Sequence, residues 1–418
     1  MPRFIHAADV HLDSPMRGLQ DYSGAPLDEV RGATRVALEK LVDLAIERAV
    51  DLVLFAGDLY DGDWQDYNTG LHFAGQMSRL QRHGVKAAVI FGNHDAVSQI
   101  TKYLRPPDNV HLFGDKAPES VEFRELGLAV HGMSFGRRHV EENLALLYPA
   151  PFPGVYNIGL LHTSVNGRPG HDPYAPCTLE HLEDRGYQYW ALGHIHQREV
   201  LCEDPWVVFP GNLQGRHIRE TGPKGCTLVT VEDGEATVEE RELDVVRWEE
   251  CRVGGEGCSD PEDVADAIVT RWQELLDDVA APVLATRVVV TGRSRACERM
   301  VASPEHWLNE LRSRANDVGA GRLWLEKLQV VVPAEAETTS AGVGDPSLLE
   351  TLFACGLTDA DLAELAASPV VAELLGKLPE ELRRSEDGFG AAPDALRELV
   401  PRAEAYLRDR LAGGGEGR

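Results

Sequence analysis

Short apolar runs alternate with longer amphipathic stretches along the first half of the chain. The runs RFIHAADV, DLVLFAGD and VKAAVIFGNHD have the length of buried strands, and polar residues end each of them. Residues 28–49 and 67–83, between these runs, carry apolar side chains at helical spacing. The order strand, helix, strand, helix, strand predicts an α/β domain.

Further runs of strand type extend this domain to about residue 235. They are LAVHGMSF, NIGLLHTS, YQYWALGHIH and WVVFPGN, and no long helical pattern separates each of them from the next. This pattern predicts helices layered on mixed sheets. We expect Tyr187, Tyr189 and Trp190 in the core rather than stacked on a nucleic-acid base, and His6 as a hydrogen-bonded structural residue.

The composition changes near residue 235, where an acidic and glycine-rich segment begins. Residues 236–335 show helical patterns in PEDVADAIVTRWQELLDDV and SPEHWLNELRSRA and strand patterns in ATRVVVTGRS and RLWLEKLQVVVP. Residues 336–418 are expected to form a linker, helices at about 346–383 and 392–412, and a disordered tail. The predicted domains are therefore 1–235, 236–335 (α+β) and 336–418.

The composition also bears on the compartment of the protein. The 418 residues include no stretch of roughly 18–20 apolar residues, the length of a membrane span, and the start MPRFIHAADV lacks a signal-peptide pattern. Seven cysteines without a CxxC pair suit reduced thiols. We therefore expect a cytoplasmic protein with no membrane partner.

Charge and histidine are both distributed unevenly. The net charge is −27, of which residues 1–230 carry −8 and the rest carry −19. Every histidine except His306 lies before residue 218, which places candidate chemistry in the first domain. An acidic chain is not expected to bind DNA tightly by itself, because phosphate recognition usually needs a basic surface.

Asp, Asn and His residues stand at the carboxyl ends of the predicted strands. In WALGHIHQ, His194 and His196 are two residues apart, so an extended strand directs both to one face. Alone, such a pair is more often a solvated strand end. The full set of candidate metal ligands is Asp9, His11, Asp58, Asn93, His162, His194 and His196. Because strand ends build the sites of α/β sheets, we expect all seven on one rim.

These ligand types restrict the metal and the reaction. Carboxylate, imidazole and amide groups without a thiolate suit Mn, Fe or Zn. Seven ligands exceed the needs of one ion that must also admit water and substrate, which favours two divalent ions. Glycines at 57, 92 and 193 are expected to allow close approach of backbone and metal. The site predicts hydrolysis of a phosphate ester.

The motifs DVH, GD, GNHD, a later H and GHIH, in this order, resemble the signature of the calcineurin-like metallophosphoesterases. GDLYD, LLHTS, ALGHIHQ and FPGNLQGRHIRE resemble segments of their DNA repair nuclease branch, the SbcD-type exonucleases and YhaO-like relatives, over residues 3–230. The resemblance implies a layered α/β/β/α domain with mixed sheets, a small α+β capping domain and C-terminal helices. It also implies a DNA substrate, two divalent ions, with Mn²⁺ expected, and an SMC-like (SbcC-type) ATPase partner. Homodimers are common in that family.

The resemblance also implies roles for individual residues. One ion would be held by Asp9, His11, Asp58 and His196, and the other by Asp58, Asn93, His162 and His194. His94 matches a non-ligand catalytic histidine, and Asp95 is expected to orient it. Asp13 stands where many relatives have glycine, and Asp61 stands where archaeal relatives have a second catalytic histidine. Asp61 either replaces that histidine or caps the next loop, and we favour the cap.

Arg216 and His217, in FPGNLQGRHIRE, are candidate contacts for a substrate phosphate. A turn with solvated side chains explains them equally well.

Three functions stay open at this point. They are a DNA exonuclease or endonuclease that acts in repair with an SMC-like ATPase, a small-substrate phosphodiesterase or phosphatase, and a scaffold with an inactive site. Intact ligands at all seven positions argue against the scaffold. The long region after the first domain favours the nuclease, because a small-molecule phosphatase has little use for it. The leucine spacing in residues 349–375 fits either docking on the ATPase or a helical hairpin packed on this chain.

Overall fold

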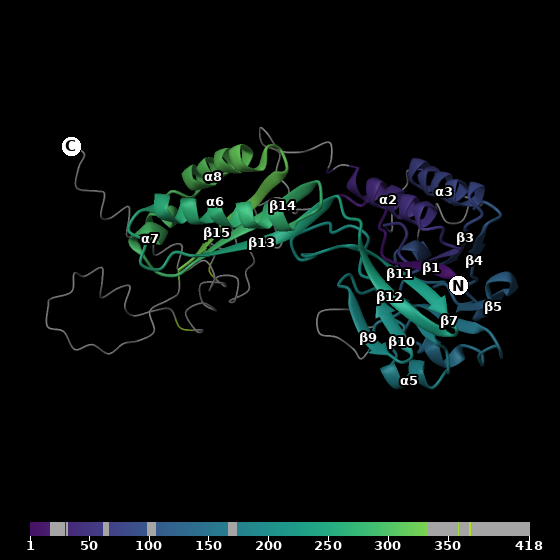
Figure 1. The fold of residues 1–418 in the computed structure, drawn as a ribbon. Helices are drawn as coiled ribbons and strands as arrows, with labels where there is room; N and C mark the ends of the chain where they lie inside the picture. Colours follow the sequence, from purple (N-terminus) through teal and green to yellow (C-terminus); the bar gives the residue numbers. More distant parts are fainter. Residues whose placement is uncertain are drawn as a thin grey trace, which may run out of the picture. The chain divides into compact units, whose positions relative to one another are not determined.

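The computed structural model describes residues 1–16, 30, 32–61, 67–97, 106–165, 174–332, 358 and 368 (Figure 1). The chain divides into two compact units. One comprises Met1–Glu250, Glu274–Thr286 and Asn316–Glu326, and the other comprises Cys251–Gln273, Arg287–Ala315 and Lys327–Arg418. No helix in the described ranges is long and apolar enough to cross a membrane. Apart from positions 358 and 368, the predicted C-terminal helices lie outside the described residues.

The first sheet has six strands in the order β12-β11-β1-β2-β3-β4. These strands are β1 (Arg3–Ala7), β2 (Leu52–Ala56), β3 (Lys86–Ile90), β4 (Val110–Leu112), β11 (Gly225–Glu232) and β12 (Glu235–Glu242). β1 to β4 are parallel, and β11 and β12 continue the sheet with antiparallel pairing. The edge strand β12 reads EATVEERE, and its sequence did not predict a strand because glutamate is depleted in strands.

The second sheet also has six strands, in the order β5-β6-β7-β8-β10-β9. They are β5 (Glu119–Phe123), β6 (Leu128–Gly132), β7 (Tyr156–His162), β8 (Tyr189–Gly193), β9 (Glu199–Glu203) and β10 (Trp206–Phe209). β6, β7, β8 and β10 are parallel, whereas β5 and β9 pair antiparallel at the two edges. Both sheets are therefore mixed, as predicted.

Apolar side chains pack in three layers around the two sheets. The layer between the sheets contains Phe4, Leu54 and Ile90 from the first and Ile158, Leu160 and Tyr189 from the second. On its other face, the first sheet packs against α2 (Ala33–Glu47) and α3 (Tyr67–Arg82), which lie together in Figure 1. The outer face of the second sheet packs against η3 (Leu144–Leu147) and α5 (Leu179–Glu183). This α/β/β/α order confirms the predicted fold class.

The aromatic residues at the start of β8 and just before it lie in this core. Tyr187, Tyr189 and Trp190 are 2%, 0% and 0% exposed, which confirms their assignment as core residues. His6 is also buried, and its ring nitrogens lie 3.1 Å from the Tyr189 hydroxyl and 3.0 Å from the Leu192 carbonyl oxygen. Burial lowers the pKa of His6 to about 3, so this histidine is neutral and structural.

A third, three-stranded sheet follows in the order β13-β14-β15. Its strands are β13 (Val246–Gly254), β14 (Val283–Thr291) and β15 (Leu323–Val331), and the helices of this region are α6 (Pro261–Asp278), α7 (Arg295–Ala302) and α8 (Pro304–Gly319). The expected α+β composition is confirmed, whereas the predicted boundaries stay predictions. The short helix α7 was not predicted; Ser294 caps it by accepting a hydrogen bond from the Cys297 N–H at 3.1 Å.

Candidate metal centre

Strands from both sheets end at one place and supply the candidate ligands. Asp9 and His11 follow β1, Asp58 follows β2, Asn93 follows β3, His162 ends β7, and His194 and His196 follow β8. Five of these residues are buried, and the two from the β8 end are half-buried. The first sheet therefore contributes four of the seven side chains and the second sheet contributes three.

Asp9, His11 and His196 form the first group of candidate ligands, with ligand atoms that all lie within 4.8 Å of one another. The Nε2 atoms of His11 and His196 face each other at 3.3 Å. Asp9 Oδ1 is 3.8 Å from His196 Nε2, and Asp58 Oδ2 is 4.0 Å from His11 Nε2. Two N–H groups cannot face each other at this distance, so at least one imidazole presents a lone pair to the space between these residues.

Asp9, Asp58 and His162 form the second group, again within 4.8 Å. His162 Nε2 lies 3.4 Å from Asp58 Oδ2 and 3.0 Å from Asn93 Oδ1. The opposite nitrogen, Nδ1, donates to the Ala56 carbonyl at 2.9 Å, which leaves Nε2 to face the site. No such group among the described residues contains His194, although its ring contacts the ring of His162 with centroids 5.3 Å apart. The role of His194 as a ligand stays a prediction.

Four of the seven candidate ligands have left-handed backbone conformations. The φ angle is +50° at Asp9, +42° at His11, +51° at Asp58 and +102° at His194. Residues other than glycine rarely adopt such angles, at a cost of about 1–3 kcal/mol each. Backbone hydrogen bonds enforce them here, for example from the N–H groups of Asp9 and His11 to the Gly57 and Asp58 carbonyls, both 3.0 Å. Strain concentrated where strands of the two sheets end indicates a functional site.

The three glycines of the motifs lie where a side chain would collide with the site. A Cβ at Gly92 would lie 2.3 Å from Asp58 Oδ1, and one at Gly193 would lie 2.0 Å from the Ala56 carbonyl oxygen. At Gly57, which has φ +93°, a Cβ would lie 2.6 Å from His162 Nδ1. The structure refines the prediction, because these glycines leave space for backbone and for the ligand side chains themselves.

Burial and charge act in opposite directions on the ionisable ligands. Burial raises the pKa of Asp9. Burial also acts to raise the pKa of Asp58, but His162 and His94 hold it well below its ordinary value. Burial acts to lower the pKa of His162, yet Asp58 and Asp9 raise it to about 9. The surroundings of the His162 ring therefore favour a positive charge, which a proton or a metal cation can supply.

The donor set fits two divalent ions. Both groups consist of carboxylate oxygens and imidazole nitrogens, with an amide oxygen beside the second, which are ligands that suit Mn, Fe or Zn. Asp58 lies within reach of both groups, as a bridging carboxylate must. A third group of His11, Asp58 and His94 also has ligand atoms within 4.8 Å, so distance alone does not separate His94 from the ligands.

His94 contacts Asp61, and this corrects the expected pairing with Asp95. His94 Nδ1 lies 2.8 Å from Asp61 Oδ1. The other carboxylate oxygen of Asp61 accepts a hydrogen bond from the Ser14 hydroxyl at 2.8 Å. Asp61 therefore faces the site, whereas the sequence favoured a loop cap.

Asp95 lies behind the ligands and binds backbone. Its carboxylate accepts hydrogen bonds from the N–H groups of Leu59 at 3.1 Å, Tyr60 at 2.8 Å and Gly92 at 3.0 Å. Burial, with the charge of Asp58, raises the pKa of Asp95 to about 7. Asp95 ties the chain after β2 to the chain after β3 and so positions the residues that carry two of the ligands.

The segment after β10 also reaches the site. Arg216 Nη2 lies 3.1 Å from Glu220 Oε1 and 3.4 Å from His196 Nδ1. His217 Nε2 lies 3.7 Å from the same oxygen of Glu220. Contact of Arg216 and His217 with a phosphate stays a prediction. The sequence interpretation missed Glu220, a buried carboxylate whose Oε1 lies 2.6 Å from His196 Nδ1. The sequence pointed to Glu220 only through its place in FPGNLQGRHIRE, the segment that also contains Arg216 and His217.

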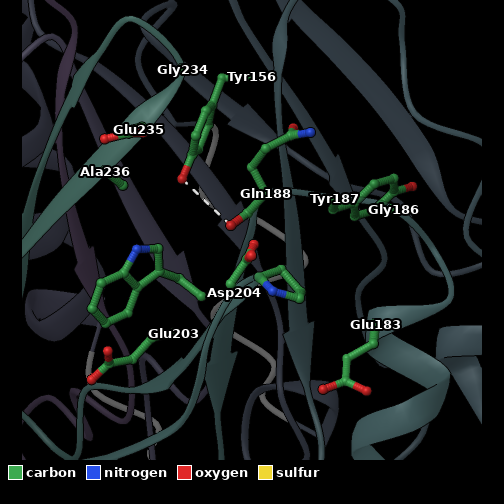
Figure 2. Close-up of a pocket in the computed structure, with 12 residues that line it drawn as sticks. Tyr156, Glu183, Gly186, Tyr187, Gln188, Glu203, Asp204, Gly234, Glu235 and Ala236 are labelled. Atoms are coloured by element: carbon green, nitrogen blue, oxygen red, sulfur yellow. Dashed lines mark hydrogen bonds between the residues drawn. The ribbon is translucent and has the colours of Figure 1, made fainter.

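A cavity of about 520 Å³ lies at the other end of the second sheet (Figure 2). Its lining includes Tyr156 and Trp206, the first residues of β7 and β10, and four carboxylates, those of Glu183, Glu203, Asp204 and Glu235. β7 runs from Tyr156 to His162, so the cavity is about 20 Å from the ligands at roughly 3.3 Å per residue. Its acidic lining does not suit a phosphate ester.

Comparison with known proteins assigns the chain to a family. Residues 2–198 match the calcineurin-like phosphoesterase family, and residues 248–332 match the middle domain of the metallophosphoesterase YhaO. The chain belongs to the calcineurin-like metallophosphoesterase family, whose dimetal members bind two divalent ions.

Within this family, the chain is similar to an uncharacterized metallophosphoesterase YhaO of Bacillus subtilis. The two are 32% identical over 98% of this chain and 97% of that protein. The DNA double-strand break repair protein Mre11 of Sulfurisphaera tokodaii is 25% identical over 58% of this chain, and that of Aeropyrum pernix is 27% identical over 58%. These matches span 63% and 60% of the archaeal proteins, so they leave more than a third of each uncovered.

Proposed function

We propose that this metallophosphoesterase is a DNA nuclease, an exonuclease or endonuclease that uses two metal ions and acts in DNA repair. The observation that carries the proposal is the meeting of two ligand groups that share Asp9, with Asp58 within 4.0 Å of a histidine of each group and His94 beside them. The Mre11 relatives, named as DNA double-strand break repair proteins, support DNA as the substrate. Manganese is the proposed ion.

The residues around the ligands suit hydrolysis of a phosphodiester. When bound, two divalent ions supply an activated water and stabilise the phosphoryl oxygens. Burial acts to lower the pKa of His94, but Asp61 and Asp58 raise it above its ordinary value. A protonated His94 can donate to the leaving oxygen. Arg216 offers a guanidinium group for a phosphate oxygen.

The test is digestion of end-labelled linear duplex, single-stranded DNA and bis(p-nitrophenyl) phosphate by the full chain with Mn²⁺. The parent should cleave DNA and the ester, and His94→Ala should lose about 10²–10⁴-fold in turnover, the contribution of a general acid. The variant should retain its metal content. If the metal were lost instead, His94 would be a ligand, as the third group of ligand atoms allows.

A small-substrate phosphodiesterase or phosphatase is the second candidate. The net charge of −27 favours it, because an acidic surface repels a polyanion. Cleavage of the small ester without any cleavage of DNA, alone or with a partner, would support this alternative.

A partner that delivers DNA would reconcile the acidic chain with a DNA substrate. We propose an SMC-like (SbcC-type) ATPase as this partner, docked through residues 336–418. Deleting these residues should abolish co-purification with the ATPase, and unchanged co-purification would contradict the docking proposal. The homodimer and the cytoplasmic location stay predictions; light scattering of the full chain tests the first, and cell fractionation tests the second.

A further inference from the structure

Residues 210–224, the crossing segment, connect β10 of the second sheet to β11 of the first and pass behind His196. Asn212 forms an isolated bridge with Ala8, next to the ligand Asp9. The N–H of Asn212 also donates to the His196 carbonyl at 3.2 Å. Gly211, with φ +79°, lies so close that a Cβ would be 3.0 Å from the same oxygen. The crossing segment therefore contacts the chain next to ligands from both sheets.

Glu220, in the crossing segment, holds the imidazole ring of His196. Glu220 Oε1 accepts a hydrogen bond from His196 Nδ1 at 2.6 Å, so His196 Nε2 is left with a lone pair that faces the first ligand group. The second oxygen of Glu220 accepts from Asn212 Nδ2 at 2.9 Å and from the Arg216 N–H at 2.7 Å. Glu220 is 6% exposed, and these partners fix its carboxylate. A carboxylate on the far nitrogen of a ligand histidine sets its tautomer and increases its basicity.

Lys224, at the end of the crossing segment, holds the backbone of the same ligand. Its Nζ donates to the His196 carbonyl at 2.8 Å, and the residue is 3% exposed. A buried ammonium group is costly without charge partners. Glu220, Asp244 and Glu240 supply negative charge around it, and Arg247 is the nearby cation. Both the ring and the carbonyl of His196 are therefore fixed by charged side chains.

His162, the histidine of the second ligand group, is held on the Nδ1 side of its ring by a backbone carbonyl and not by a charged side chain of the described residues. His162 Nδ1 donates to the backbone carbonyl of Ala56, a neutral acceptor in β2. No charged side chain in the described ranges forms a hydrogen bond with His162 on that side of the ring. The two groups of ligands thus differ in how their histidines are supported, which makes them separable by mutation.

We infer that Glu220 and Lys224 are positioning residues for one metal position, the one formed by Asp9, His11 and His196. This inference rests on the two-metal site of the proposed function but not on DNA as its substrate. Loss of such support typically weakens metal binding about 10–100-fold. Removing either residue should weaken one of the two positions by that factor and leave the other at its parent affinity.

The test is Mn²⁺ binding by the metal-free full chain without substrate, measured by calorimetric titration and by metal content after dialysis. The variants are Glu220→Gln, which keeps the shape but removes the charge, and Lys224→Met. Lys40→Met is the matched control, because Lys40 Nζ also donates to a backbone carbonyl, that of Asp244, at 2.9 Å, and this residue is not a ligand. Melting curves of the metal-free variants report any loss of fold.

We expect the parent and Lys40→Met to bind two Mn²⁺ ions with high affinity. Glu220→Gln and Lys224→Met should bind one Mn²⁺ ion with the parent affinity and the second one more weakly. In the double variant with His196→Ala, Lys224→Met should not weaken Mn²⁺ binding further, because both changes affect the same position. In the double variant with His162→Ala, neither position should bind Mn²⁺ with the parent affinity. Parent affinity at both positions, or equal weakening of both, would overturn the inference. A variant series that behaves as expected in a protein that does not cleave DNA would count against the proposed substrate alone.

Discussion

Replacing Asp61 with asparagine tests whether His94 needs a carboxylate behind it. The two side chains meet at 2.8 Å and are 29% and 21% exposed for His94 and Asp61. A hydrogen bond to a charged group stabilises by about 1.5–3 kcal/mol, and about 1.36 kcal/mol corresponds to one pKa unit. Because both side chains are partly exposed, we take the lower end, about 1.5 kcal/mol, and expect the pKa of His94 to fall when the charge of Asp61 is removed.

The direction of the effect follows from the role of His94 as an acid. The proton on His94 is present below its pKa and is lost as the pH rises through it. Asp61→Asn lowers this pKa, so the alkaline limb of the kcat/KM profile should move to lower pH. Above both pKa values, activity should be about tenfold below that of the parent.

The assay is hydrolysis of bis(p-nitrophenyl) phosphate from about pH 5 to 9 at saturating Mn²⁺, with metal content measured for each protein. Asp43→Asn is the matched control, because Asp43 pairs with Arg79 between α2 and α3, away from the ligands. An alkaline limb at the same pH in variant and parent, with metal content unchanged, would refute the role given to Asp61. Loss of metal would assign Asp61 to the support of His11, whose Nδ1 lies 3.9 Å from it.

Three further changes test the site and the core. Gly193→Ala places a Cβ 2.0 Å from the Ala56 carbonyl oxygen, so the variant should fold poorly or lose metal. A melting temperature and a metal content equal to those of the parent would contradict the close packing of β8 on β2. Chelation of the metals leaves the buried Asp9 and Asp58 with histidine as their only counter-charge among the described residues. Restoring Mn²⁺ at about 100 times its Kd should stabilise the fold by about 2.7 kcal/mol for each occupied site, measured by urea unfolding with and without EDTA. Trp190→Ala removes a fully buried ring and should lower the free energy of unfolding by about 3–5 kcal/mol; a loss below about 1 kcal/mol would show that the outer layer does not depend on it.

The sequence predicted the strand ends of the site because a few local rules determine them. Apolar runs identify β1, β2, β3, β7 and β8, and parallel pairing brings their carboxyl ends together. The residues that follow neighbouring strands of one sheet, such as Asp9 and Asp58, therefore had to lie close together, whereas the approach of Asp9 to His196 depends on how the two sheets pack on each other. The same rules missed β12, because its four glutamates contradict strand propensity and only pairing with β11 stabilises it.

Residues that support the ligands were harder to predict. Asp95 directly follows His94, but the short turn after β3 directs its side chain to the backbone behind the site. Asp61 has the composition of a loop residue, and only the path of the chain after β2 places it against His94. Glu220 reaches His196 from 24 residues away through the crossing segment. Such contacts depend on loop geometry, which local patterns do not determine.

The division of the ligands between two sheets has a kinetic consequence. A cation held by Asp9 and His11 on one side and by His196 on the other joins the two sheets across the apolar layer between them. Such an ion cannot keep its full coordination while the sheets separate, so its departure and the transient parting of the layers become coupled events. Occupancy of this position should then slow amide hydrogen exchange in β1 and β8, and the rate at which the two layers part would set the residence time of the ion.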